Sequence, residues 1–145
     1  MAITNHERVG KALELLKAGL APVVEREIKS AIAANTLSMQ KVRGFVDDPL
    51  LAKKGIGEWD ASALVKLMWE TWNEVFRKTL GHAERSLVSE IRDWRNKWAH
   101  QEPFSSDDTD RALDSVERLL TAVSSPQADD VRRMKMELRD RKSVV

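Results

Sequence analysis

HAERSLVSEIRDWRNKWAH, residues 82–100, carries the clearest helical pattern in the chain. Its large apolar residues recur at spacings of four, three and four, which places them on one face of a helix: Leu87, Ile91, Trp94 and Trp98. Pro103 follows shortly after, and the residue before a proline avoids the helical region, so the helix is expected to end near Glu102. This stretch therefore predicts a long amphipathic helix that ends just beyond His100.

Upstream of it, residues 61–80 are predicted to form a second long helix. Asp60 is suited to cap its start, because an aspartate side chain accepts hydrogen bonds from the free amides of a first turn. Gly81 is expected to separate it from the next helix. Its apolar stripe is broad: Leu64, Leu67, Met68, Val75 and Phe76. The two long helices are predicted to lie antiparallel at the centre of the fold.

Shorter helices are expected to flank this pair. Near the N-terminus a helix capped around Thr4 is predicted to break at Gly19 and Pro22. Pro22 lacks an amide proton, so it fits the first turn of another helix that runs to about Ala34. Residues 35–45 predict one more helix.

The rest of the chain adds a loop and two more helices. Residues 47–59 contain one proline and two glycines and are predicted to be a loop. Ser105 begins a cap-rich start to a helix that reaches about Val123, and residues 129–142 have helical propensity. No stretch alternates with a period of two. The fold class predicted is all-α, a helical bundle.

The turn at residues 124–126 suggests a division of the chain. Residues 1–124 are predicted to form the main helical domain, and residues 125–145 a C-terminal helical extension or the start of a linker. This last segment is basic and ends without a recognisable cap. We therefore expect the natural polypeptide to continue into a further domain or effector module.

Composition narrows the possible functions. The 145 residues include 42% hydrophobic and 32% charged residues and carry a formal net charge of +1, so tight non-specific binding to duplex DNA is not indicated. There is no cysteine, and the three histidines lack ligand spacing, so no metal site and no cofactor are implied. No window has the length and apolarity of a membrane span, and no signal peptide is recognisable. A cytoplasmic protein that does not contact membranes is expected.

The segment Arg95-Asn96-Lys97-Trp98-Ala99-His100 is the candidate for chemistry. Five residues rotate by ~500° along an ideal helix, which leaves Arg95 and His100 ~140° apart. They can converge only if His100 lies at the frayed end of the helix, or if a second protomer brings another copy. The Glu102-Pro103 stop makes the first arrangement plausible.

An arginine, a polar residue and a histidine a few residues later resemble the R-x4-6-H signature of HEPN domains. The surrounding sequence, Trp69-Glu70-Thr71-Trp72-Asn73-Glu74-Val75-Phe76 and Leu80-Gly81-His82-Ala83-Glu84-Arg85, is similar to the Swt-type HEPN subfamily. The resemblance covers roughly residues 5–124. In bacteria, domains of this type stand at the front of larger proteins, some of them linked to phage defence.

The resemblance implies a metal-independent endoribonuclease that acts on single-stranded RNA at a cleft between two protomers. His100 would transfer protons, Arg95 would hold the phosphate, and Asn96 would position the substrate or the histidine. Lys97 and Arg92 would contact RNA. The homodimer would form through the motif helix, so that two motifs supply an acid and a base. Phage defence or RNA surveillance would be the setting.

Structural interpretations remain open beside this one. Arg95 could pair with Glu90 or Asp93, and His100 could simply cap carbonyls. The five tryptophans predict core packing or a helix–helix dimer seam rather than base stacking. His6, near the N-terminus, is expected to be solvated. The acidic residues that surround the motif, Glu102 among them, favour the alternative function, a non-catalytic dimerisation and docking module of a larger protein.

Overall fold

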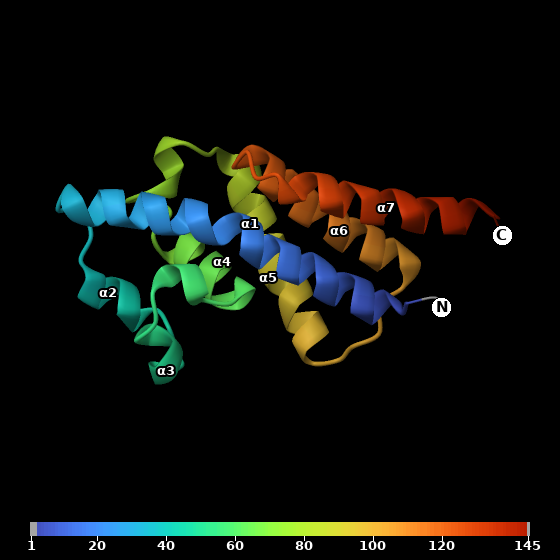
Figure 1. Ribbon diagram of the computed structural model, residues 1–145, viewed down its shortest axis with the longest axis horizontal. Coiled ribbons are helices and arrows are strands. Elements are labelled where there is room, and N and C mark those ends of the chain that lie inside the picture. Colours follow the sequence, from blue (N-terminus) through green and yellow to red (C-terminus); the bar gives the residue numbers. More distant parts are fainter. Residues whose placement is uncertain (1–2, 145) are drawn as a thin grey trace.

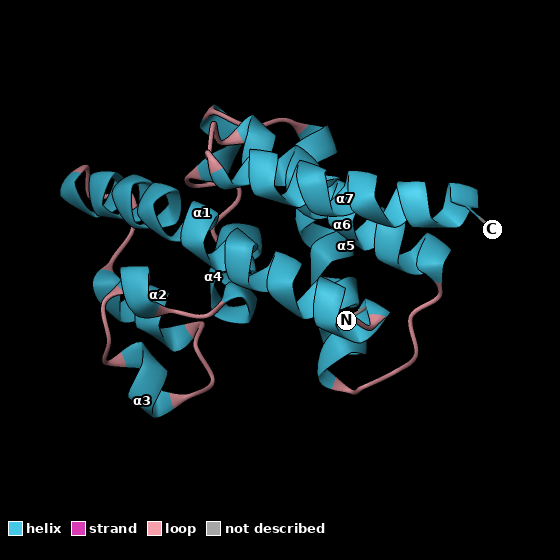
Figure 2. Ribbon diagram, turned by 45° about the vertical axis from the view of Figure 1, so that its right-hand side comes forward, coloured by secondary structure: helices cyan, strands magenta, loops and turns pink. Residues whose placement is uncertain are grey.

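The structure, a computed structural model, describes residues 3–144, with side chains described as far as residue 141. Within that range the chain consists of helices and turns with no strand (Figure 2). The elements along the chain are α1 (Asn5–Ala33), α2 (Met39–Gly44), α3 (Pro49–Ala52), η1 (Ile56–Glu58), α4 (Ala61–Glu70), η2 (Phe76–Lys78), α5 (His82–Ala99), α6 (Ser106–Ala122) and α7 (Gln127–Val144). The predicted all-α class is confirmed.

Side-chain caps begin three of the helices that form the body of the fold. Thr4 accepts a hydrogen bond from the Glu7 amide at the start of α1, at 3.1 Å. Asp60 accepts one from Ala63 at the start of α4, at 2.9 Å, as the sequence predicted. Ser105 begins α6 in the same way. Each cap satisfies an amide that the helix itself leaves without a partner.

Helix α1 is continuous over 29 residues, so the predicted break at Gly19 and Pro22 is wrong. A proline inside a helix costs about 3 kcal/mol, because it lacks an amide proton and its ring crowds the preceding turn. Full burial of one aliphatic side chain contributes about 1.5–3 kcal/mol. Four such side chains, fully buried, lie on both sides of Pro22: Leu16, Leu20, Val24 and Ile28. Their packing outweighs the cost of the proline.

The predicted long helix over residues 61–80 is also wrong, because α4 ends at Glu70. The buried Thr71 hydroxyl donates to the Leu67 carbonyl at 2.6 Å, and irregular turns follow before η2. Trp72 and Phe76 nevertheless remain buried, with their rings stacked at a centroid distance of 6.3 Å. The apolar pattern of this segment thus indicated burial correctly and helix length incorrectly.

Helix α1 lies at the centre and contacts α4, α5, α6 and α7, and Figure 1 shows it crossing the molecule between these helices.

Residues 47–59 are more ordered than the predicted loop, since they contain α3 and η1. Trp59, which follows η1, is fully buried, and its indole nitrogen donates to the Lys54 carbonyl at 3.2 Å. Among the described helices, none combines the length and apolarity that crossing a membrane requires.

Helix α7 is held to α6 by a charge cluster as well as by its apolar face. Lys135 is buried, and its ammonium lies 3.0 Å from an Asp114 oxygen and 3.3 Å from a Glu117 oxygen. Burial on its own would raise the pKa of Asp114, but hydrogen bonds and charge attraction from Lys135 and Arg118 outweigh it, so the pKa lies below its usual 3.8. The ionised carboxylate therefore stabilises this helix pair.

We expect the cluster to make the stability of the fold depend on acid. A carboxyl group with a depressed pKa in the folded state contributes stability above its unfolded pKa and loses it as the pH falls through the folded pKa. Asp114→Asn should therefore lower the melting temperature at pH 7 and flatten its decline below about pH 4. Asp140→Asn, at an exposed site on α7, is the control. Parallel pH profiles for Asp114→Asn and the parent protein would contradict this account.

Candidate functional site

The C-terminal end of α5 is closed by backbone hydrogen bonds that fix the place of His100. The Gln101 amide donates to the Trp98 carbonyl at 3.0 Å, and the Glu102 amide donates to the Lys97 carbonyl at 3.1 Å. Gln101 has a left-handed backbone, with φ of 55°. These bonds form a Schellman motif, in which His100 is the C-cap residue and is exposed to solvent.

The beginning of α1 packs against this same end of α5. The His6 ring stacks on the Trp98 indole, with centroids 5.2 Å apart and planes 12° from parallel. His6 Nε2 donates to the Trp98 carbonyl at 3.0 Å, and Trp98 Nε1 donates to the His6 carbonyl at 3.1 Å. A Cβ on Gly10 would lie 3.1 Å from Trp98 Nε1, so this approach favours glycine. The expectation that His6 is solvated is therefore wrong.

Arg95 borders a polar cavity of about 230 Å³ between α4 and α5. Arg92, which lies three positions before Arg95 and four before Asn96, and Asn96 itself line the cavity with it, and Lys66 joins them from α4. Lys66 pairs with Asp47 at 3.3 Å, whereas the Arg95 side chain has no hydrogen-bond or ion-pair partner among the residues that the structure describes. Cationic side chains thus outnumber carboxylates in this cavity by three to one.

The structural interpretation of Arg95 as an ion-pair partner of Glu90 is not supported. Glu90 instead accepts a hydrogen bond from Arg111 of α6 at 2.6 Å. Asp93 lines a different pocket from the cavity that Arg95 borders, and it has no ion-pair partner in the described part of the chain. Arg95 therefore remains available to an anion from outside the protomer.

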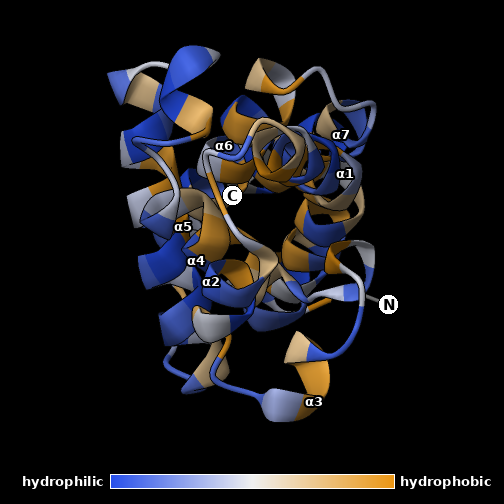
Figure 3. Cartoon of the chain, turned by 90° about the vertical axis from the view of Figure 1, so that its left-hand side faces the viewer, coloured by the Kyte–Doolittle hydropathy of each residue, from blue (hydrophilic) through white to orange (hydrophobic). Residues whose placement is uncertain are grey.

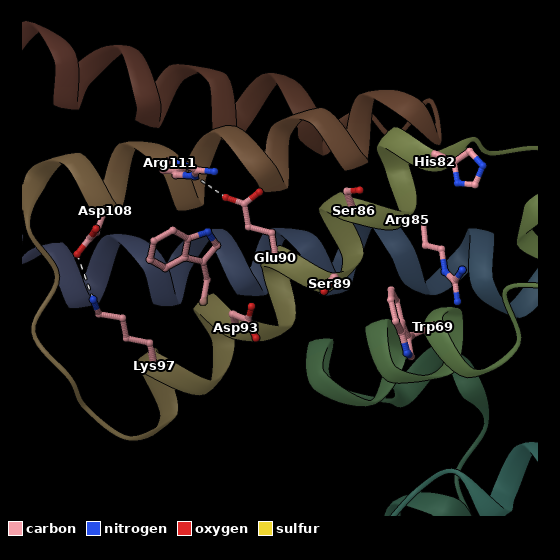
Figure 4. Close-up of a pocket in the computed structure, with 11 residues that line it drawn as sticks. Trp69, His82, Arg85, Ser86, Ser89, Glu90, Asp93, Lys97, Asp108 and Arg111 are labelled. Carbon is pink, nitrogen blue, oxygen red and sulfur yellow. Dashed lines mark hydrogen bonds and ion pairs between the residues drawn. The ribbon is translucent and has the colours of Figure 1, made fainter.

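Lys97 lies on the other flank of α5 (Figure 4). Its ammonium is 3.1 Å from Asp108 of α6, and the hydrogen bond that it donates is the largest cause of the lowered pKa of Asp108. The two residues line a pocket of about 740 Å³ together with Trp69 and Arg85, whose guanidinium lies 4.5 Å from the Trp69 ring. Lys97 is thus not among the residues of the Arg95 cavity.

All five tryptophans of the chain pack against other residues of the same chain. Trp94 contacts Phe104 at a ring distance of 6.0 Å, and Trp98 contacts His6, so both are half-buried. Trp59 and Trp72 are buried in the core, and Trp69 is half-buried beneath Arg85. Core packing is confirmed for Trp59 and Trp72, and the other three pack against the edge of the core.

Sequence reasoning missed the residues that tertiary packing brings to the site. Lys66 and Ser62 reach the Arg95 cavity from α4, and His6 reaches the end of α5 from α1. The helical periodicity of residues 61–68 places Ser62 and Lys66 on one face, away from the buried Leu64 and Leu67, which was the only local signal. In residues 3–144, no group of three or more histidine, aspartate or glutamate side chains is arranged to hold a metal ion.

Comparison with protein families shows the family of this chain. The family model described as Swt1-like HEPN matches residues 11–124, which includes α4, α5, the motif and α6. The chain belongs to the Swt1-like HEPN family. The resemblance to this HEPN subfamily seen in the sequence is thereby confirmed. Comparisons with curated proteins and with solved structures gave no significant match.

The matched range contains the motif of this HEPN domain but not every residue that packs against it. Residues 95–100 lie within the matched range, whereas His6 and the whole of α7 do not. The stacking of His6 on Trp98 is thus contributed by a part of the chain that the family model does not cover.

The Schellman motif makes a testable prediction about the site. A β-branched residue at position 101 is strained at positive φ, so Gln101→Val should destabilise the fold by about 1–2 kcal/mol. Gln101→Gly is the matched control and should be neutral or stabilising, because glycine adopts this conformation freely. Chemical denaturation measures both. Equal stability of the two variants would show that the turn does not constrain the end of α5.

Proposed function

We propose that this HEPN domain is a metal-independent endoribonuclease that cleaves single-stranded RNA. Arg95 binds the phosphate at which cleavage occurs, His100 transfers a proton, and Asn96 orients the substrate. Arg92 adds a further contact to the RNA backbone, and Lys97 adds one from the other flank of the helix. The active unit is a homodimer in which the two motif helices face each other.

The observation that carries this proposal is the unpaired guanidinium of Arg95 in a cavity rich in cations. Arginine is always charged at neutral pH, and its planar group can bind two phosphate oxygens at once. Exposed arginines commonly lie near carboxylates, yet the carboxylate nearest in sequence, Asp93, faces another pocket, and Glu90 is taken by Arg111. Arg92 and Lys66 beside it strengthen the field for an anion.

His100 supplies the proton transfer that the reaction needs. The RNA 2′-oxygen loses its proton and attacks the adjacent phosphorus, the bond from phosphorus to the 5′-oxygen breaks, and the leaving 5′-oxygen takes up a proton. The products are a 2′,3′-cyclic phosphate and a 5′-hydroxyl end, so atoms and charge balance without water or metal. Histidine suits both proton transfers because its ordinary pKa is near neutral.

A dimer follows from the number of groups that this reaction uses. One step needs a base and the other an acid, but each motif provides a single histidine. Two protomers with facing motifs supply both, and two Arg95 side chains then flank one phosphate. The position of His100 at the exposed end of α5 supports this arrangement, because it leaves the ring accessible to a partner and to RNA.

A second function, a non-catalytic dimerisation and docking module, is supported by the acidic surroundings of the motif. Lys97 is held by Asp108, and the exposed Glu102 lies two residues after His100. These carboxylates weaken attraction to RNA on that flank.

We place the nuclease in phage defence or RNA surveillance, the settings that the family resemblance suggests.

His100→Ala is expected to abolish cleavage of single-stranded RNA while leaving the melting temperature almost unchanged. Loss of one acid or base group costs about 100- to 10,000-fold in rate, and an exposed C-cap residue contributes little packing. Arg95→Ala should be inactive and should also bind RNA more weakly, because it removes the phosphate contact. Gel assays of cleavage, equilibrium binding and thermal unfolding measure the three effects.

Matched substitutions separate catalysis from general damage. His82→Ala and Arg43→Ala remove the same side chains from exposed sites outside the motif and should keep activity. Cleavage should also continue in EDTA, since no step uses a metal ion. A parent protein that cuts no RNA, with motif variants that only melt earlier, would favour the docking module. Cleavage that stops in EDTA and returns with magnesium would overturn the mechanism.

The dimer is testable separately. Ala99 is exposed between Arg95 and His100, so Ala99→Glu places a carboxylate within the proposed interface. We expect it to shift the protein from dimer to monomer in light scattering and to reduce cleavage in parallel. Ala18→Glu, at an exposed position on α1, should change neither. A parent protein that stays monomeric at high micromolar concentration would remove the basis for a two-protomer site.

A further inference from the structure

A second hollow, of about 410 Å³, is also bordered by Arg95. Its wall is mostly apolar and comes from three helices: Gly10 and Leu13 of α1, Ala61 of α4 and Trp98 of α5. This volume falls within the usual range for sites that hold small molecules or parts of larger ligands. We call it the α1 groove.

The α1 groove and the polar cavity share two residues, Arg95 and Ser62. Arg95 therefore stands on the border between a cation-rich site and a site with apolar walls. A nucleotide has the same division, because its phosphate is an anion and its base has flat apolar faces. Single-stranded RNA is recognised through bases that leave the stack and enter such pockets.

The rim of the α1 groove carries polar groups without partners in the protein. Glu7 and Glu14 lie on the face of α1 that lines the groove. Lys11 lies between them in the sequence, and Lys17 follows Glu14. None of these four side chains has an ion-pair or hydrogen-bond partner among the described residues. The rim therefore offers both acceptors and donors to the edge of a bound base.

We propose that the α1 groove binds the base of the nucleotide whose phosphate is held by Arg95, and that it selects bases that carry an exocyclic amino group. The inference rests on the RNA-binding part of the proposed function and adds a basis for sequence preference. Because Arg95 borders both sites, a phosphate bound there places the attached base at the groove. The carboxylates on the rim then determine which base is bound.

The selection follows from hydrogen-bond chemistry. A carboxylate only accepts hydrogen bonds, so Glu7 and Glu14 pair with the amino groups of adenine, cytosine and guanine. Uracil has no amino group, and its one ring donor on the base-pairing edge, N3–H, lies between two carbonyl oxygens that a carboxylate repels. Uracil should therefore be the least favoured base next to the cleaved phosphate. The lysines can donate to ring nitrogens and carbonyl oxygens of any base, so they add affinity, and the selectivity depends on the carboxylates.

The experiment compares short single-stranded RNAs that differ only at one position beside the cleavage site. Cleavage is measured with the parent protein, and equilibrium binding is measured in the His100→Ala background, so that each can be read without the other. The parent should prefer adenine, cytosine or guanine over uracil by about 5- to 100-fold, the range expected for one well-paired base edge. Glu14→Lys should remove or reverse this preference.

Glu137→Lys, which makes the same charge change at an exposed site on α7, should keep the preference. Cleavage or binding without base preference, or a preference that Glu14→Lys leaves intact, would overturn the inference and leave the nuclease standing. Binding with the expected preference but no cleavage would support the groove and overturn the nuclease. If Glu14→Lys instead changes only the oligomeric state, the groove is covered by a second copy of the chain and the inference fails.

Discussion

The burial of one stripe of α1 is the constraint on which the other helices depend. Because this helix contacts α4, α5, α6 and α7, its apolar side chains form the common surface against which they align. Figure 3 shows α1 as one wall of a ring of helices whose hydrophobic parts, in orange, face the space that they enclose. The N-terminal end of the same helix packs against the end of α5, where His6 and Trp98 are joined by two hydrogen bonds. The placement of the motif is thus a consequence of how α1 is buried.

Local signals predicted the elements whose ends are set by local chemistry. The helix over residues 82–100 was predicted correctly, because its apolar spacing, the preceding glycine and the following proline all agree. Pro22 was misleading because its local cost is outweighed by contacts with helices far away in sequence. The segment 61–80 was misleading for the opposite reason. Its periodicity continues through the turns after Thr71, because burial rather than helical structure produces the pattern.

The residues of the candidate site also fall into those that the sequence could predict and those that it could not. Arg92, Arg95 and Asn96 could be grouped from the sequence, since a helix brings residues three and four positions apart to one face. The end of α5 was also expected from the proline stop, although the left-handed Gln101 that completes it carries no glycine signal. Ser62, Lys66 and the walls of the α1 groove come from other helices. Their convergence depends on the packing of α1 and α4 and has no counterpart in residue spacing.

The formal net charge of the whole chain is a poor guide to where this protein could bind an anion. The formal net charge of +1 argued against tight non-specific binding to duplex DNA, and the basic C-terminal segment was the obvious cationic run in the sequence. In the structure its cations are largely neutralised: Lys135 and Arg132 contact Glu117, and Arg139 contacts Asp110. Arg95, by contrast, lies in a sequence rich in acids and yet has no carboxylate partner among the described residues. Attraction to an anion depends on which cations remain unpaired at one place, so the weakly charged total is compatible with a phosphate site at Arg95.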